Sequence, residues 1–122
     1  MDSPFLGVKN QEAEPYMRMR HGNKVNILNP KPEQIIVDDI AWHLARQCRF
    51  NSALTQWYSN AEHCIMGAKM AGNDQLAREF LIHDAAEYVF GDIPSPVGRL
   101  CPEYKKLCNE FQDFIYKTFK RK

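Results

Sequence analysis

A long amphipathic stripe near the end of the chain sets the first limit on its fold. Apolar and small side chains recur every three or four residues between 102 and 120, namely Tyr104, Leu107, Cys108, Phe111, Phe114, Ile115 and Thr118. This period places them along one face of an α-helix of about five turns. Such a face is stable only when buried, so we expect other helices to pack against it.

The segment 33–48 carries a similar signal. Its apolar residues Ile40, Leu44 and Cys48 are four apart, and two acidic residues lie near its start, where a helix dipole favours negative charge. This segment is the first predicted core helix.

A second helix is predicted from 60 to 71. Ser59 and Glu62 have the form of a capping box, in which each side chain accepts a backbone N–H of the other residue. Gly72 is a natural end for this helix.

The third predicted helix, from 73 or 74 to 90, mixes apolar and polar positions. Leu81, Ala85 and Val89 are four residues apart and are expected to face the core. Within this stretch, residues 83–87 carry a His and two acids that packing alone does not need.

Together these segments predict an all-α fold, a compact helical bundle of four to five helices with an irregular N-terminal lead-in. No segment shows convincing strand alternation, although a short hairpin around 21–23 fits the lead-in. His21 has no partner at ligand spacing. Residues 1–16 are polar and aperiodic, so we expect a flexible arm followed by one domain over 17–122.

Composition excludes some classes of partner. With 16 Lys and Arg against 15 Asp and Glu, the formal net charge is +1, so no global field favours a nucleic acid polymer or an anionic membrane. No run approaches the roughly 20 apolar residues that span a bilayer. The four cysteines form no Cys-x-x-Cys pair, which favours a reduced, cytoplasmic compartment.

Polar residues on the second and third predicted helices point to chemistry. His83 and Glu87 are four apart and share a helix face, Asp84 is next to His83, and His63 lies on the preceding helix. Two imidazoles and a carboxylate suit a divalent transition metal, and a further carboxylate suits proton transfer to or from water. Taken singly, each residue also fits a hydrogen-bonded core position, so spacing alone leaves both interpretations open.

Three segments in order, "DIAWHLARQCRF", "YSNAEHC" and "LIHDAAEYVFGDIPSP", resemble the HD-domain metal-dependent phosphohydrolases. The resemblance is to the bacterial 5'-deoxynucleotidase-like branch and related phage nucleotide hydrolases, and it covers roughly 18–120. It implies an HD-domain fold, a nucleotide substrate, a homo-oligomer (a dimer or larger) and a bacterial or phage-infected host cytosol.

The resemblance also implies a role for each matching residue. His63, His83 and Asp84 would bind a catalytic divalent metal, with Zn, Mn or Co favoured and Mg also compatible. Glu87 would act on the attacking water. The implied reaction removes phosphate or polyphosphate from a (deoxy)nucleotide through a metal-bound water.

The implied substrate-binding residues lie on either side of this group. Arg49 would contact phosphate with its bidentate donor fork, and Phe50 would pack against the nucleotide. Asp92 would lie at the sugar end of the pocket. Tyr58 is a further candidate for its wall.

The chain departs from the family pattern in ways that affect these implications. The second metal-binding Asp of the family is expected beyond the helix at 102–120, so the C-terminal part of the usual domain is interpreted as missing. Asp113 falls on that helix and is interpreted as a solvated side chain. Ser52 and Ala53 replace a usual Gly-His, and Gly98 replaces a usual Lys.

Two other interpretations follow from these departures. A degenerate relative would bind a nucleotide without hydrolysing it, as a sensor or sequestering module. A purely structural helical subunit would bind neither metal nor nucleotide, but it would have no need for Glu87.

Overall fold

A computed structural model describes residues 15–120 of the chain. Of the predicted arm, 1–16, only residues 15 and 16 are among those described. Tyr16 already belongs to the first strand.

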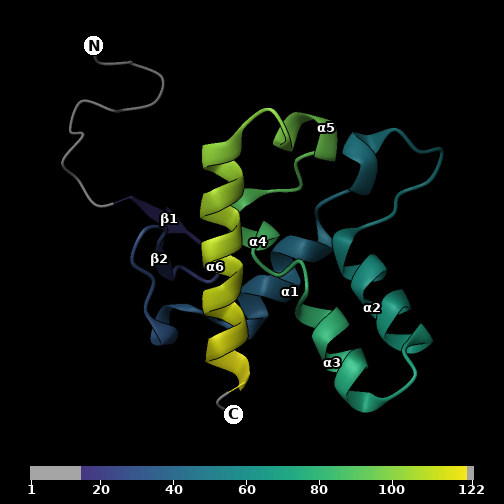
Figure 1. Cartoon of the computed structure of the whole chain (residues 1–122), viewed down its shortest axis with the longest axis horizontal. Helices are drawn as coiled ribbons and strands as arrows, with labels where there is room; N and C mark the ends of the chain where they lie inside the picture. Colours follow the sequence, from purple (N-terminus) through teal and green to yellow (C-terminus); the bar gives the residue numbers. More distant parts are fainter. Residues whose placement is uncertain (1–14, 121–122) are drawn as a thin grey trace.

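The described chain is mostly helical, which confirms the predicted all-α class (Figure 1). None of the helices within residues 15–120 combines the length and apolar character needed to cross a membrane. The elements in chain order are strands β1 (Tyr16–Arg18) and β2 (Lys24–Asn26), the 3-10 helix η1 (Pro32–Gln34), α1 (Val37–Ala45), the 3-10 helix η2 (Arg49–Ser52), α2 (Asn60–Met70), α3 (Asp74–Ile82), α4 (Glu87–Phe90), α5 (Ser95–Gly98) and α6 (Pro102–Lys120).

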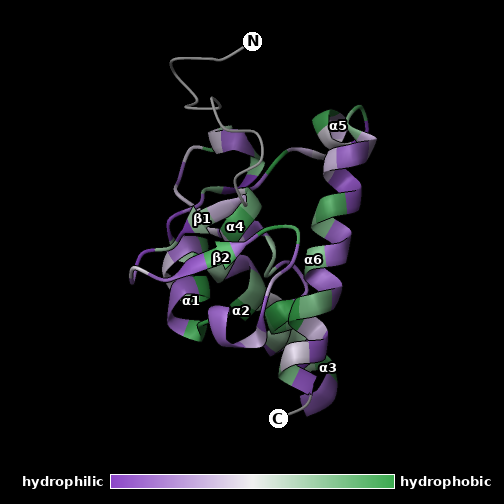
Figure 2. Cartoon of the chain, turned by 90° about the vertical axis from the view of Figure 1, so that its left-hand side faces the viewer, coloured by the Kyte–Doolittle hydropathy of each residue, from purple (hydrophilic) through white to green (hydrophobic). Residues whose placement is uncertain are grey.

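The core gathers around α6, whose bounds agree with the predicted stripe. Along this helix, apolar and polar residues alternate in bands, as an amphipathic helix requires (Figure 2). Phe111 and Ile115 are buried on its inner face, and Tyr88 of α4 packs its ring near Phe111. Other buried apolar residues come from the lead-in, α1 and the segment 85–89, namely Met19, Val25, Ile35, Ile40, Leu44, Ala85, Ala86 and Val89.

The predicted hairpin in the lead-in is present. β1 and β2 pair in antiparallel register, and Gly22 adopts a φ of 84° in the turn, which favours glycine. The next residue back, His21, has a partner that sequence spacing did not reveal. Its Nδ1 lies 2.5 Å from Oδ1 of Asp39, a fully buried residue of α1. Asp39 is one of the two acids expected to interact with the helix dipole, and this contact holds the lead-in against α1.

The first core helix is shorter than the predicted 33–48. Ile35 and Ile36 are extended, and α1 begins only at Val37. Ile35 is buried in the core in this extended form, while the Gln34 side chain accepts the backbone N–H of Lys31. Burial of Ile35 and the local bond therefore outweigh the helical propensity of this segment.

The third helix is also not continuous, contrary to the prediction of one helix to residue 90. It is split into α3 and α4 by a turn at 83–86. Inside that turn, Ala85 N–H bonds to Ile82 O at 3.1 Å and Glu87 N–H to Asp84 O at 3.0 Å, which is the i to i+3 pattern of a tighter helix. The turn carries both His83 and Asp84, so the break in the helix lies at the predicted site.

Candidate metal centre

Local capping signals place the candidate ligands. Ser59 Oγ accepts Glu62 N–H and Glu62 Oε1 accepts Ser59 N–H, both at 3.0 Å, so the predicted capping box is present and starts α2 at Asn60. His63 therefore lies in the first turns of α2. The helix α3 starts after the Asn73 cap and runs antiparallel to α2 (Figure 1), and the ring of Phe80 near its end lies 5.4 Å from that of His63.

The three predicted metal ligands come together in the structure. One ligand atom each from His63, His83 and Asp84 lies within 4.8 Å of the others. All three side chains are half-buried, which leaves room for solvent or substrate. The chemistry of the donor set, two imidazole nitrogens and one carboxylate oxygen, fits a divalent transition metal.

The hydrogen bonds of His83 orient it as a ligand. Its Nδ1 lies 2.5 Å from the carbonyl oxygen of Phe80, which can only accept, so Nδ1 carries the proton. Its Nε2 then presents a lone pair toward Oδ2 of Asp84, 2.9 Å away. Two such acceptors repel each other unless a proton or a cation lies between them. A backbone carbonyl on the outer nitrogen is the usual support of a metal-bound His.

His63 is held among aromatic rings. Its ring centroid lies 5.4 Å from those of both Phe80 and His83, and 6.5 Å from Tyr58. Burial, followed by the positive charge of Arg49, lowers the pKa of His63 below its usual value. A neutral imidazole is the form that binds a metal, so these surroundings favour ligation at neutral pH.

The contact between α2 and α3 at the cluster depends on a glycine. A Cβ atom at Gly67 would lie 1.8 Å from the ring of Phe80. That ring in turn packs against His83, with centroids 4.2 Å apart. Only a hydrogen at position 67 lets the Phe80 ring support both imidazoles.

We therefore predict that Gly67→Ala damages both the fold and the metal centre. The new methyl group must displace the Phe80 ring, at a cost of about 1–3 kcal/mol in the free energy of unfolding, and metal affinity should fall with it. Thermal unfolding with and without Zn²⁺ measures both effects. Gly72→Ala is the control, since a Cβ there meets nothing within 4 Å; equal behaviour of the two variants would contradict the role of Gly67.

Glu87, the predicted proton-transfer residue, starts α4 immediately after the ligand turn. Burial, followed by the negative charges of Asp84 and Asp92, raises its pKa to about 8. Its Oε2 is buried and has no hydrogen-bond partner within residues 15–120. A buried carboxyl that titrates near neutral pH is suited to exchange protons with a substrate or water.

Electrostatic effects also place two of the predicted substrate residues near the cluster. The positive charge of Arg49 lowers the pKa of Glu87, whereas the negative charge of Asp92 raises the pKa values of both Glu87 and His63. The Nε of Arg49 is buried without a partner among the described residues. Arg49 is therefore a cation close to the cluster with hydrogen-bonding capacity to spare.

Phe50 lies on an unusual loop beside Arg49. Phe50, Asn51 and Ser52 all have φ between 52° and 69°, the left-handed region that non-glycine residues seldom adopt. The Phe50 ring is 59% exposed, and the Arg49 guanidinium lies 5.0 Å from its centroid. Phe50 thus lies on an exposed surface rather than in the core, and this loop carries backbone strain of the kind found at binding sites.

Two hollows adjoin the cluster and share His83 as a wall. The smaller, of about 220 Å³, has a mixed polar and apolar lining and is bordered by Asp84 and Glu87 and by Lys105 of α6. The larger, of about 770 Å³, is mostly apolar and is bordered by His63 and by aromatic and methionine side chains. Tyr58, the remaining predicted wall residue, lines this larger hollow.

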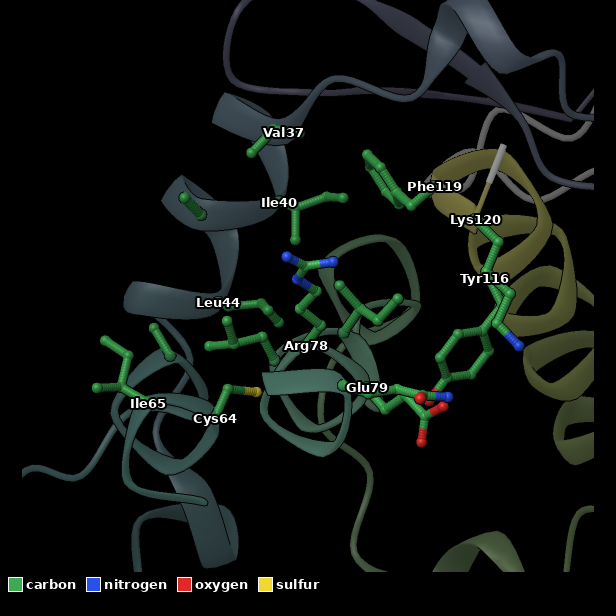
Figure 3. Close-up of a pocket in the computed structure, with 15 residues that line it drawn as sticks. Val37, Ile40, Leu44, Cys64, Ile65, Arg78, Glu79, Tyr116, Phe119 and Lys120 are labelled. Carbon is green, nitrogen blue, oxygen red and sulfur yellow. The ribbon is translucent and has the colours of Figure 1, made fainter. Parts of the chain in front are cut away.

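A third hollow, of about 900 Å³, lies between α1, α2, α3 and α6 (Figure 3). Its walls are mainly aliphatic, and none of the three candidate ligands borders it. Leu81 does border it and is 43% exposed, so the prediction that Leu81 faces the core is wrong. Ala85 and Val89, on the other side of the helix break, are buried as predicted.

Sequence reasoning missed two glutamines near the cluster, of which Gln112 alone bonds to the turn that carries His83 and Asp84. Gln47 donates from Nε2 to the backbone oxygen of Glu87 at 2.8 Å and accepts from buried Asn60 at 2.8 Å. Gln112 of α6 bonds to both ends of the ligand turn. A glutamine has no spacing signal, and the partners of Gln47 and Gln112 are distant in sequence, so no local pattern could have revealed them. Asp113 is exposed and is not part of the cluster.

No protein-family model matches the chain. It is similar to two bacterial proteins. The uncharacterized protein YfdR of Escherichia coli is 39% identical over 75 residues, which cover 62% of this chain and 42% of that protein. The uncharacterized protein RCAP_rcc00048 of Rhodobacter capsulatus is 36% identical over 90 residues, which cover 67% and 46%. The chain therefore spans less than half the length of these relatives.

Proposed function

We propose that this protein is an HD-domain phosphohydrolase that uses a divalent metal to cleave phosphate or polyphosphate from a nucleotide. The observation that carries the proposal is the convergence of His63, His83 and Asp84, with ligand atoms within 4.8 Å of one another. The order of the sequence segments and the buried acid Glu87 beside the cluster support it further.

His63, His83 and Asp84 would hold the metal, and their geometry fits it. The carbonyl of Phe80 fixes the tautomer of His83, and the close approach of its Nε2 to Asp84 Oδ2 suits a shared cation. When bound, a divalent ion supplies Lewis-acid activation of the phosphoryl group and of a water molecule.

The remaining residues would bind, orient and exchange protons. Arg49 would donate its unpartnered Nε–H to a phosphoryl oxygen, and Glu87 in its ionised form would receive the proton of the attacking water. The apolar hollow bordered by Tyr58 would take the base, and the exposed ring of Phe50 would pack against the nucleotide. Asp92 would accept hydrogen bonds from sugar hydroxyls.

A second candidate function is nucleotide binding without hydrolysis. It is favoured by the number of ligands, because residues 15–120 bring three rather than four metal-binding side chains together. Three ligands with one carboxylate can hold a metal, but the loss of an anionic donor weakens binding.

The test uses the 122-residue chain with Mn²⁺, Co²⁺, Zn²⁺ or Mg²⁺ and a panel of ribo- and deoxynucleoside mono- and triphosphates. We expect release of phosphate or polyphosphate from at least one member, and a chelator should stop it. Absence of both hydrolysis and metal binding would contradict the proposal. Tight nucleotide binding by calorimetry, unchanged by chelation and without hydrolysis, would instead support the second candidate.

A further inference from the structure

We propose that Gln112 is a positioning residue for the metal centre, whose side-chain amide holds open the turn that carries His83 and Asp84. The inference rests on the proposed function, since it assumes that this turn binds a metal. Gln112 is not one of the three clustered ligands, and it acts through the backbone on either side of two of them.

The amide of Gln112 is inserted into the hydrogen-bond ladder of the helix. Its Oε1 accepts Ala86 N–H at 2.8 Å, and its Nε2 donates to Ile82 O at 2.6 Å. In a continuous α-helix these two backbone groups would bond to each other. One helical bond is thus replaced by two bonds to a side chain, and such insertion is a recognised cause of a helix break.

The insertion determines the direction of the ligands. Residues 83–85 lie between the two anchored backbone groups and follow the tighter i to i+3 pattern. A 3-10 turn rotates each residue by about 120° rather than about 100°, so His83 and Asp84 point differently from the way they would in an extension of α3. In this arrangement their ligating atoms are 2.9 Å apart.

Gln112 is itself fixed by the core. It lies between Phe111 and Ile115 on α6, and both of these side chains are at most 2% exposed. The long helix therefore serves as a rigid support from which one amide reaches the ligand turn. A turn held in place by the core would spare metal binding the cost of reorganising it.

Gln47 offers a matched control. It too is half-buried and uses both ends of its side-chain amide, donating to Glu87 O and accepting from Asn60. Its bonds are outside the span from 82 to 86. Loss of either glutamine should cost similar stability, but only loss of Gln112 should disturb the ligands.

The experiment compares Gln112→Met and Gln47→Met in the whole chain, with Co²⁺ as the probe. We expect Gln112→Met to weaken Co²⁺ binding about 10- to 100-fold, as losses of supporting bonds around a metal do, and to change the d–d absorption band. Gln47→Met should keep the wild-type band and affinity. Thermal unfolding without metal should show a similar loss of stability in both.

The possible outcomes separate this inference from the proposed function. If the wild-type chain binds Co²⁺ and Gln112→Met binds it equally well, or both variants weaken it equally, the positioning role is overturned and the proposed function stands. If the wild-type chain binds neither Co²⁺ nor Zn²⁺, both are overturned. Should Gln112→Met not fold, Gln112→Glu keeps the acceptor for Ala86 N–H but loses the donor to Ile82; an unchanged band in that variant overturns the inference.

Discussion

Replacing Asp84 with Asn should abolish tight binding of a divalent metal and, with it, hydrolysis. Asp84 is the one carboxylate in the cluster, and its Oδ2 faces the lone pair of His83 Nε2 at 2.9 Å. The amide of Asn can donate a hydrogen bond to that nitrogen, which closes the space between the two ligands and removes the anionic charge. We expect metal affinity to fall by at least about 100-fold, beyond the range seen for losses of supporting residues alone.

Calorimetric titration with Zn²⁺ measures this change directly, and Asp113→Asn provides the control. Asp113 is an exposed acid on α6 outside the cluster, so its variant should bind metal like the wild type. Loss of metal binding in Asp113→Asn, or its retention in Asp84→Asn, would show that the ligands have been wrongly assigned. Without metal, Asp84→Asn should fold normally, because the carboxylate is half-exposed and its loss leaves no buried group unpaired.

Elements governed by local signals could be predicted from the sequence. The stripe on α6, the capping box at Ser59 and the start of a helix at 73 or 74 each depend on residues within one or two turns, and all three are present. The grouping of His63 with the His83–Asp84 pair was implied by the family resemblance, whereas the spacing of these residues alone left it open.

Features set by contacts between distant residues could not be predicted in this way. The helix break depends on Gln112, which lies 30 residues from Ile82. The extended conformation of Ile35 depends on the burial of its side chain in the core. Because the helical period was assumed to continue through the break, Leu81 was assigned to the same face as Ala85 and Val89. The close approach of α2 to α3 likewise depends on Gly67, which carries no pattern of its own.

Replacing Glu87 with Gln should stabilise the metal-free protein at alkaline pH. The Glu87 pKa is about 8 in the folded chain, against an ordinary value of 4.5 for a Glu side chain. Between these values the folded state keeps a proton that the unfolded state releases, so the free energy of unfolding falls as pH rises through this window. Gln cannot ionise, so the variant should escape this fall and be more stable than the wild type by on the order of 2 kcal/mol at pH 8.5, after allowance for solvent access.

The same substitution should nearly abolish catalysis while sparing the metal. Glu87 is outside the three-ligand cluster, so Zn²⁺ affinity should stay close to wild type, whereas loss of its proton transfer should slow hydrolysis about 10²- to 10⁴-fold. Thermal unfolding from pH 5 to 9, metal titration and hydrolysis rates on one preparation measure all three quantities, with exposed Glu110→Gln on α6 as the control.

Loss of metal binding in Glu87→Gln would make Glu87 a ligand. An unchanged hydrolysis rate would remove it from the reaction, and a pH profile like that of Glu110→Gln would show that its carboxyl is not buried in the folded chain. A gain in stability combined with a loss of activity is expected of a buried acid held in place for chemistry, because its ionised form is unfavourable to the fold and useful only to the substrate.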